Sequence, residues 1–359
     1  MPLRRNESLV QSVIKSASGG RVRSNPYYRG PVTDHFDGQR FYNPGEPVTD
    51  RSVHEVLRWQ RASPKNAWPT KIDVQQIVPA SRVDELTVTM IGHATVLIQI
   101  AGLNLLTDPV WSDRASPFHL VGPKRVAVPG IALTDLPPID VILLSHNHFD
   151  HFDVQTLRKL KAGHSPLFVT PLGNDVLIRR YLPDARIETG DWGDFVSIGK
   201  NTEIHIVPAN HWSGRSLHDR RMALWSGFMV RTAGRLIYFA GDTGYGTGRI
   251  FRNMRRQFGS PDLAILPCGA YDPRWFMATQ HVDPEEAIQI MCDLDADKVL
   301  GMHWGVFKLT DEAWNDPAIR LSKELEARKN NSTRFQPMLP GQVAHISLCD
   351  ARHQPEKRD

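Results

Sequence analysis

The stretch ILLSHNHFDHFD, residues 142–153, constrains this chain more than any other part of its sequence. It begins as a continuous apolar run of the kind found in a buried strand, and it then places three histidines and a carboxylate within six residues. Side chains two apart in extended backbone point to the same side, so His146 and His148 can face one point. The following turn carries Asp150 and His151 towards a second point. The spacing therefore indicates two metal positions at the end of one strand.

Two metal positions need more ligands than this stretch supplies, because a zinc ion takes three or more protein groups, usually with a water molecule. Three further candidates follow strand-like runs: His211 in VPANHW, Asp242 in FAGDTG and His303 in GMHWG. With the four residues of the first stretch they would complete two coordination shells. Eight other histidines are interpreted as ordinary surface or hydrogen-bonded residues: His35, His54, His119, His164, His205, His218, His345 and His353.

The composition is that of a folded globular protein. The chain has 359 residues, 41% of them hydrophobic and 23% charged, which is enough to bury a large core. No run reaches the roughly 18 apolar residues that a membrane helix needs. Residues 1–20 carry basic side chains without the apolar segment of a secretory signal. These features predict a cytoplasmic protein that meets membranes only peripherally, at the inner face, and they leave a homodimer open.

The charge is mild, with a formal net value of +4 and with Lys and Arg spread along the chain, so a nucleic-acid partner is not expected. Residues 249–259, RIFRNMRRQFG, place four arginines on an expected helix. A solvated basic face is the favoured interpretation there, and contact with anionic lipid or a partner protein is the alternative. Cys268, Cys292 and Cys349 lack the CxxC spacing of a zinc ribbon and are interpreted as unpaired thiols.

The texture of the sequence divides the chain into three parts. Residues 1–85 have Pro and Gly punctuation with one helical pattern at 50–62, and we interpret them as an extension that wraps the main domain. From residue 86 to 350, strand patterns such as 86–92, 94–102, 104–110, 139–146, 202–212, 223–232, 235–244, 263–271 and 298–305 alternate with helical ones. Residues 351–359 are a polar tail. Asp153 is a candidate N-cap of the helix after the histidine cluster. The pattern predicts a layered α/β sandwich with a site at one rim.

The histidine cluster also carries a family resemblance. SHNHFDH resembles the signature of the metallo-β-lactamase superfamily, and the three later candidates fall in that superfamily's order of ligands. Longer strings, among them IGHATVLI, LTDPVWSDRASP, FAGDTGY, GAYDPRWFM and QHVDPEEA, resemble the family of N-acylphosphatidylethanolamine-hydrolysing phospholipases D over roughly residues 86–309. The resemblance implies an α/β fold, a four-layered αβ/βα sandwich of metallo-β-lactamase type, for residues 86–350.

Carried over position by position, the resemblance implies a dinuclear zinc hydrolase with two Zn²⁺ per chain. One ion would be held by His146, His148 and His211. The other would be held by Asp150, His151 and His303. Asp242 would bridge the two ions.

Other positions are expected to assist the ligands or the substrate. Asp108 in LTDPV ends a strand and is expected to orient a ligand histidine, with a buried turn-making aspartate as the alternative. Gln280 and His281 match family positions near the substrate phosphate, although a histidine at a helix start need have no catalytic duty. Asp150 would also accept the proton of the attacking water, and His281 would stabilise charge on the phosphoryl oxygens. Phe149 is a substrate-binding position where the mammalian family member carries a tyrosine, so a hydroxyl is missing.

The resemblance implies hydrolysis of N-acylphosphatidylethanolamine or a related glycerophospholipid to phosphatidic acid and an N-acylethanolamine. A lactonase or other carbonyl hydrolase with the same zinc site is the first alternative. A zinc-binding regulatory protein without catalysis is the second, and the filled ligand positions argue against it. Trp212, Trp275 and Phe276 neighbour site residues in the sequence, and core packing is favoured for them over a groove for acyl chains.

Overall fold

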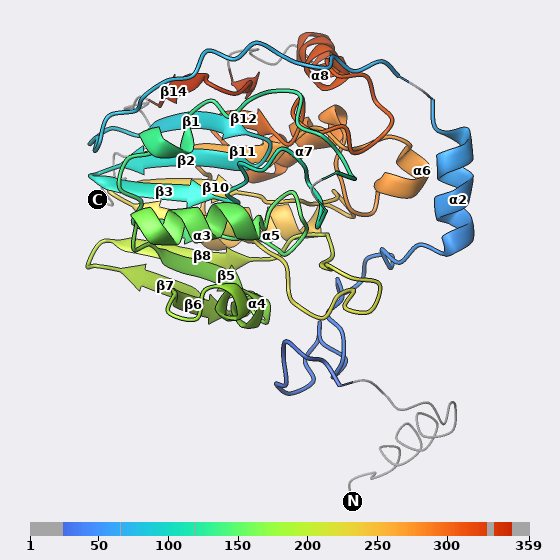
Figure 1. Ribbon diagram of the computed structural model, residues 1–359, viewed down its shortest axis with the longest axis horizontal. Coiled ribbons are helices and arrows are strands. Elements are labelled where there is room, and N and C mark those ends of the chain that lie inside the picture. Colours follow the sequence, from blue (N-terminus) through green and yellow to red (C-terminus); the bar gives the residue numbers. More distant parts are fainter. Residues whose placement is uncertain (1–23, 65, 119, 329–333, 347–359) are drawn as a thin grey trace, which may run out of the picture.

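The computed structural model describes residues 24–64, 66–118, 120–328 and 334–346. Their strands form two sheets of seven, which pack face to face and carry helices on their outer sides (Figure 1). The predicted four-layered αβ/βα sandwich is thereby confirmed. The predicted tail at 351–359, together with Cys349, His119 and His353, lies outside the described residues.

The first sheet has the strand order β14-β1-β2-β3-β4-β5-β6. Its strands are β1 Thr87–Gly92, β2 Thr95–Ile100, β3 Leu103–Thr107, β4 Val141–Leu143, β5 Leu167–Pro171, β6 Arg186–Gly190 and β14 Val343–His345. The second sheet has the order β13-β12-β11-β10-β9-β8-β7. Its strands are β7 Phe195–Ile198, β8 Thr202–Val207, β9 Gly227–Thr232, β10 Arg235–Phe239, β11 Leu263–Pro267, β12 Lys298–Met302 and β13 Phe335–Pro337.

The two sheets are built alike, each beginning antiparallel and continuing parallel. In the first sheet β1, β2 and β3 are antiparallel and β3 to β6 are parallel. In the second, β7 to β10 are antiparallel and β10 to β13 are parallel. Parallel strands bring their carboxyl ends to the same edge, which is where sites form in open α/β sheets. In each sheet, several strands therefore end at the same rim.

Three of the described helices begin at a polar residue whose side chain caps the first turn. Helix α2 Val53–Ala62 has a capping box of Ser52 and Glu55, and α3 Val154–Gly163 is capped by Asp153, as predicted. Helix α7 Pro284–Leu294 is capped by Asp283. The others are α4 Asn174–Tyr181, α5 Arg249–Phe258, α6 Arg274–Met277, α8 Asp316–Ala327 and the 3-10 turn η1 Leu133–Asp135.

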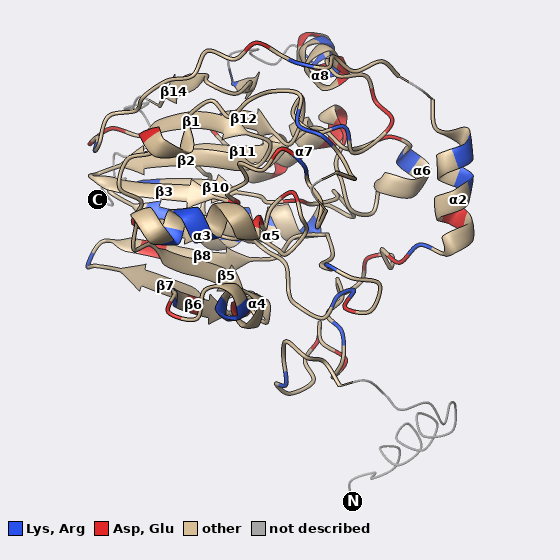
Figure 2. Ribbon diagram, in the orientation of Figure 1, with Lys and Arg blue, Asp and Glu red and all other residues tan. Residues whose placement is uncertain are grey.

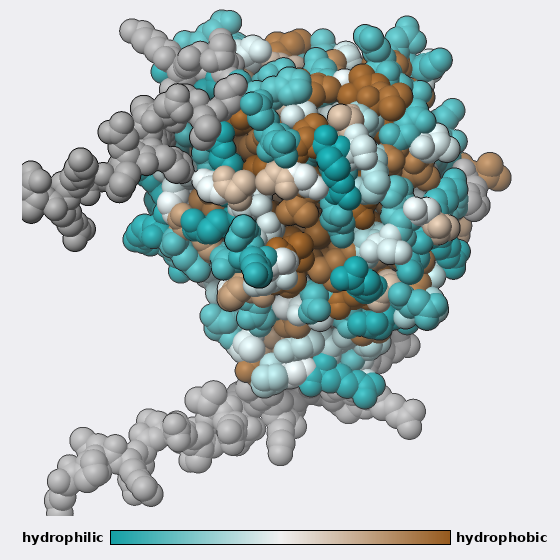
Figure 3. All heavy atoms as spheres, turned by 90° about the vertical axis from the view of Figure 1, so that its left-hand side faces the viewer, coloured by the Kyte–Doolittle hydropathy of each residue, from teal (hydrophilic) through white to brown (hydrophobic). Residues whose placement is uncertain are grey.

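Three apolar layers hold the sandwich together. Between the sheets, Ile98 and Phe228 are among many fully buried side chains. Helices α3 and α4 cover the outer face of the first sheet through Leu157 and Leu177, while α5, α7 and α8 cover that of the second. On the face at the left of Figure 1, hydrophobic side chains gather at the centre and hydrophilic ones surround them (Figure 3). Burial of apolar side chains in the three layers is the main stabilising contribution to the fold.

Residues 24–85 run over the outside of the sandwich. Phe36 and Phe41 are buried against Trp225, whereas α2 has no buried residue and stands at the edge of the molecule (Figure 1). Trp59 of α2 donates a hydrogen bond to Asp311 at 2.7 Å. The division at residue 86 into an extension and a main domain stays a prediction.

The structure departs from the sequence pattern in the bounds of several strands. The runs expected at 139–146, 202–212 and 235–244 are strands only over Val141–Leu143, Thr202–Val207 and Arg235–Phe239. The expected strand at 223–232 begins only at Gly227, because Trp225 turns away to pack against Phe36 and Phe41. The aromatic residues of α6 divide: Phe276 is buried beside Trp59, whereas Trp275 is 41% exposed under Arg58. In the described part of the chain, no helix combines the length and apolar character needed to cross a bilayer.

The arginines of α5 are held by neighbouring groups. Arg252 pairs with Asp293 at 2.9 Å and Arg255 with Asp295 at 3.1 Å, both at the end of α7. The ribbon in Figure 2 marks basic and acidic positions on several helices, without one large region of a single charge. The ion pairs of Arg252 and Arg255 agree with the interpretation of α5 as a solvated face.

Candidate metal centre

All seven predicted ligands lie at one rim of the sandwich. Residues 146–151 follow β4 in the first sheet. His211 follows β8, Asp242 follows β10 and His303 follows β12 in the second. These strands run in the same direction within their sheet, so the carboxyl ends of both sheets meet at the same place.

Tight turns at the strand ends aim the side chains. His303 has a φ of 64° and Asp108, at the end of β3, a φ of 32°, both in a region that residues with a Cβ rarely adopt. The backbone N–H groups of His151 and Phe152 both donate to the carbonyl of His148, at 3.1 and 2.8 Å, so the chain turns immediately after that residue. Non-glycine residues with a left-handed backbone conformation occur often at functional sites.

Three imidazoles converge at what we call the first metal position, formed by His146, His148 and His211. Nδ1 of His148 lies 2.9 Å from Nε2 of His146 and 3.2 Å from Nε2 of His211. The ligand atoms of the three residues all lie within 4.8 Å of one another, so one ion could bind all three. Its donors are nitrogens only.

Asp150, His151 and His303 converge at the second metal position. Oδ2 of Asp150 lies 3.6 Å from Nε2 of His151 and 3.5 Å from Nε2 of His303. The two Nε2 atoms are 3.2 Å apart. This position therefore combines two imidazoles with a carboxylate.

Asp242 lies between the two positions. Its Oδ2 is 3.2 Å from Nε2 of His151 and 3.6 Å from Nε2 of His211, while its Oδ1 is 3.1 Å from Nε2 of His303. Ligand atoms on a tetrahedral zinc ion with bonds of about 2.0–2.1 Å are about 3.3 Å apart. The distances of the two positions lie around this value, so the residues fit a pair of such ions.

Hydrogen bonds to Nδ1 on the far side of three rings turn their Nε2 atoms towards the site. His151 donates from Nδ1 to Asp108 at 2.7 Å, and His211 donates from Nδ1 to the carbonyl of Gln280 at 2.9 Å. The hydroxyl of Ser145 lies 2.6 Å from Asp108 and 2.9 Å from Nδ1 of His146. A neutral imidazole with its proton on Nδ1 presents the lone pair of Nε2, which is the form that binds a metal.

The first position is electrically neutral. Burial, aided by the neighbouring histidines, lowers the pKa values of His146, His148 and His211 well below the ordinary value. These imidazoles are therefore uncharged at neutral pH and ready to act as ligands.

The second position accumulates charge. Burial alone would lower the pKa of His151 and of His303, but the carboxylates of Asp242 and Asp150 outweigh it. They raise the pKa of His303 to about 9 and that of His151 well above its ordinary value. Burial would likewise raise the pKa of Asp150, yet the surrounding histidines hold it well below the usual range. A carboxylate with such a low pKa is a better ligand than proton acceptor.

The predicted substrate residues are brought to the same rim in different ways. His281 has Nδ1 3.9 Å from Oδ2 of Asp242, and burial lowers its pKa to about 4. Gln280 contributes its carbonyl to His211, whereas its side-chain amide contacts the sulfur of Met277. Trp212 packs edge-on against His148 with ring centroids 4.2 Å apart.

His93 is a site residue for which the sequence reasoning proposed no role. It lies in the turn between β1 and β2, is 2% exposed, and has Nε2 2.9 Å from Oδ2 of Asp150. The only signal in the sequence was its place in the string IGHATVLI, which resembles the family without forming part of the ligand spacing. Ser145 was also missed.

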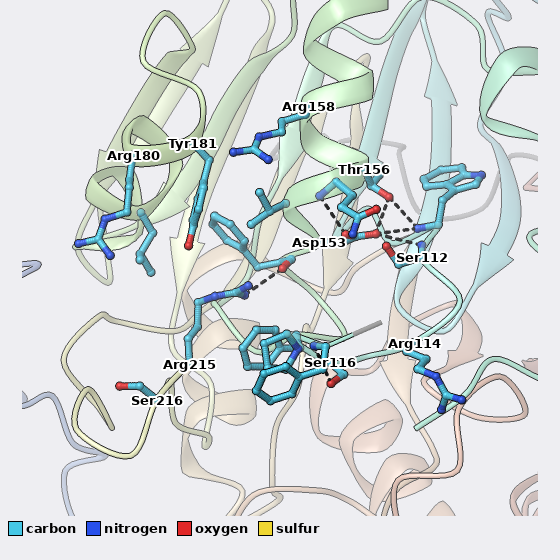
Figure 4. Close-up of a pocket in the computed structure, with 18 of the residues that line it drawn as sticks. Ser112, Arg114, Ser116, Asp153, Thr156, Arg158, Arg180, Tyr181, Arg215 and Ser216 are labelled. Atoms are coloured by element: carbon cyan, nitrogen blue, oxygen red, sulfur yellow. Dashed lines mark hydrogen bonds between the residues drawn. The ribbon is translucent and has the colours of Figure 1, made fainter. Parts of the chain in front are cut away.

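A cavity of about 870 Å³ adjoins the histidine loop (Figure 4). Phe149 and Phe152 of that loop line it, but the seven predicted ligands do not. Its cationic side chains are Arg114, Arg158, Lys159, Arg180 and Arg215. Blue bands on α3 and α4 in Figure 2 correspond to part of this set.

Arg215 links the cavity to the histidine loop. Its guanidinium donates to the carbonyls of Asn147 and Phe152, each at 2.9 Å, and lies over the ring of Phe149 at 4.1 Å. The loop that follows His211 therefore clamps both ends of the segment that carries His148, Asp150 and His151.

Comparison with known proteins places these features in a family. The model of the Beta-lactamase superfamily domain matches residues 103–304. The chain is 35% identical over 353 residues to N-acyl-phosphatidylethanolamine-hydrolyzing phospholipase D 1 of Caenorhabditis elegans, which covers 94% of this chain and 96% of that protein. It is 39% identical over 238 residues to the mitochondrial N-acyl-phosphatidylethanolamine-hydrolyzing phospholipase D of Saccharomyces cerevisiae, covering 65% of this chain and 50% of that one.

Among solved structures, isothiocyanate hydrolase from Delia radicum gut bacteria superposes with a TM-score of 0.59. The match covers 73% of this chain and 100% of that one at 18% sequence identity. At this identity the likeness concerns the fold alone.

Proposed function

The chain belongs to the metallo-β-lactamase superfamily and is a metal-dependent hydrolase, and we propose that it is a dinuclear zinc phosphodiesterase of the phospholipase D type. Its substrate would be N-acylphosphatidylethanolamine or a related glycerophospholipid. The products would be phosphatidic acid and an N-acylethanolamine.

The observation that carries the proposal is the pair of adjoining positions that share one carboxylate. Asp242 reaches His211 of the first position and both histidines of the second within 3.6 Å. Two ions held a few ångströms apart suit the in-line displacement of a phosphodiester. His146, His148 and His211 would hold one zinc ion. Asp150, His151 and His303, whose ligand atoms lie in one group with that of His93, would hold the other.

When bound, two zinc ions would supply Lewis acidity at a phosphoryl oxygen and would acidify a water molecule to a pKa of about 7. His281 is neutral and stands beside Asp242, so an N–H of its ring would donate to a phosphoryl oxygen of the substrate. Asp150 would accept the proton of the attacking water, although its low pKa favours its duty as a ligand. No side chain is needed as a covalent nucleophile.

Two observations favour a phosphodiester substrate: the cationic side chains of the cavity and the sequence similarity to phospholipases D. A phosphodiester is an anion, and the cavity beside Phe149 is rich in arginine. The curated relatives in worm and yeast are named for hydrolysis of N-acylphosphatidylethanolamine. Phe149 and Gln280 would contact the substrate, Phe149 through an apolar ring in place of a hydroxyl.

A side-by-side assay of the zinc-loaded protein tests the substrate class. N-acylphosphatidylethanolamine, other glycerophosphodiesters and lactones are offered at equal concentration, with His148→Ala as the inactive control. We expect phosphodiester turnover to dominate. Efficient lactone opening without phosphodiesterase activity would instead establish the carbonyl hydrolase.

Hydrolysis in heavy-oxygen water identifies the bond that is cut. Attack at phosphorus incorporates the label into phosphatidic acid, whereas attack at an acyl carbonyl incorporates it into a free fatty acid. We expect labelled phosphatidic acid. Label confined to fatty acid would rule out the phospholipase D assignment.

We also propose that the protein works in the cytoplasm and meets the inner face of the membrane peripherally, as a lipid substrate requires. Cell fractionation tests this, with release from membranes expected on washing with high salt or carbonate. Retention in the membrane pellet after both washes would contradict it.

A further inference from the structure

His93 is distinguished by its side-chain contacts and not by its backbone conformation. It is one of the residues that join β1 to β2, and its φ of 60° lies in the left-handed region. Histidine is among the residues enriched at positive φ, and Ala101 and Ala233 adopt a φ of 49° in the turns β2–β3 and β9–β10. The reason for a buried histidine at this place therefore lies in its side chain.

Its contacts lie within the metal centre. Nε2 is 2.9 Å from Oδ2 of Asp150, and the ring centroid is 3.9 Å from that of His303. The backbone carbonyl of His93 also accepts a hydrogen bond from the N–H of His303 at 2.9 Å. Phe307 closes the other side of the ring, edge-on at 5.3 Å. Turn and strand end are thus joined at both backbone and side-chain level.

The chemistry of the contact assigns the proton. An ionised carboxylate only accepts hydrogen bonds, so at 2.9 Å Nε2 of His93 must carry the hydrogen. Nδ1 is buried and, among the described residues, has no hydrogen-bond partner. Among the described residues, the ring therefore makes one hydrogen bond, to Asp150.

We infer that His93 is a positioning residue of the second metal position, where its Nε2–H fixes the carboxylate of Asp150. The inference rests on the proposed dinuclear centre. The oxygen that His93 contacts is the one nearest to His151 and His303, at 3.6 and 3.5 Å. Without that bond the carboxylate can rotate away from them.

The assignment completes a pattern among the ligands. His151 is held by Asp108, His211 by the carbonyl of Gln280, and His146 by Ser145. Asp150 is held by His93 in the same manner. Partners of this kind set the orientation of a ligand, and their loss typically weakens metal binding by about 10–100-fold.

A matched pair of amide variants tests the role. His93→Gln places an amide N–H near the site of Nε2, whereas the shorter His93→Asn tolerates the left-handed backbone but leaves its amide short of Asp150. Zinc affinity is measured by chelator competition, in the wild type and in a His148→Ala background that weakens the first position. Unfolding of the metal-free proteins is followed in parallel, and His93→Met is the donor-free alternative if the Asn variant is unstable. His35→Gln is the control, a buried histidine bonded to Asp191 instead of a ligand.

We expect His93→Asn to weaken zinc at the second position by about 10–100-fold, with His93→Gln and the control within about threefold of the parent. Unchanged affinity in both the Asn and Met variants would overturn the inference. So would a stoichiometry of one zinc ion in His93→Gln, because His93 would then be a direct ligand. A wild-type protein that binds no zinc would refute the proposed centre itself, a result distinct from either.

Discussion

The two metal positions lie side by side and share Asp242, yet they are built from different chemistry. The first consists of three imidazoles whose pKa values are lowered by burial. The second has two imidazoles, the carboxylate of Asp150 and the buried Asp108 behind His151. Without metal, the carboxylates of the second position keep its histidines protonated. The histidines of the first position are uncharged.

This difference shows what the rim would offer to the two proposed ions, namely two sites of unequal character. A neutral nitrogen site needs no proton to leave before an ion enters at neutral pH. A site with carboxylates binds a cation more strongly in principle, but protons compete for it. The inequality makes the two positions separable by experiment.

Removal of one ligand from each position has the largest expected effect. We expect His148→Ala and His303→Ala each to lower the zinc content from two ions to one. Turnover should fall by on the order of a thousandfold, which corresponds to an activation free energy higher by about 4 kcal/mol. Metal analysis and turnover measure both. His205→Ala, on the strand that leads to His211, should leave both unchanged. Near-normal activity in either ligand variant would show that its residue is misassigned.

The contact behind the second position is expected to matter less. Asp108→Asn keeps the shape of the side chain but removes the charge that His151 faces at 2.7 Å. We expect zinc affinity at the second position to fall by about 10–100-fold, with the first position little changed. Chelator competition checks this. An equal loss at both positions would mean that Asp108 supports the whole rim through Ser145.

Acidity should separate the positions in a way that follows from their pKa values. His303, with a raised pKa of about 9, is protonated at pH 7, so zinc must displace its proton. Affinity at the second position should then rise by about tenfold per pH unit per displaced proton from pH 7 to 9. The first position should stay flat over this range, because its histidines are already neutral.

The measurement uses His148→Ala to report on the second position and His303→Ala to report on the first. Zinc titrations at pH 7, 8 and 9 give the two slopes. Equal slopes would remove the distinction between the positions.

His35 offers the smallest effect and a reference outside the centre. Burial alone would lower its pKa, but its bonds to Asp191 and Asp34, both 2.7 Å, raise it above the ordinary value. A raised folded-state pKa stabilises the protein below the unfolded value of about 6.5, and that stabilisation is lost as the pH rises through the folded-state pKa. His35→Gln should therefore cost about 1 kcal/mol at pH 6 and less at pH 9, by denaturant unfolding. A larger cost at pH 9 would contradict the assigned protonation.

Much of the fold followed from local patterns. The strand predicted at 86–92 is found at Thr87–Gly92, and the predicted cap of α3 by Asp153 is confirmed, because apolar periodicity and capping chemistry act within a few residues. The start of β9 was wrong for the opposite reason. Trp225 has the composition of a strand residue, but it packs on Phe36 and Phe41, nearly two hundred residues earlier in the chain.

The sequence by itself determined the type of chemistry. A buried strand that runs into His146, His148, Asp150 and His151 has few other uses, and three later strands end in residues of the same kind. Which of these atoms converge was a matter of tertiary structure, because the carboxyl ends of two separate sheets meet at the rim. His93 shows the limit most clearly. No spacing relates it to the histidine cluster, and its bond to Asp150 exists only because the β1–β2 turn is hydrogen-bonded to the end of β12.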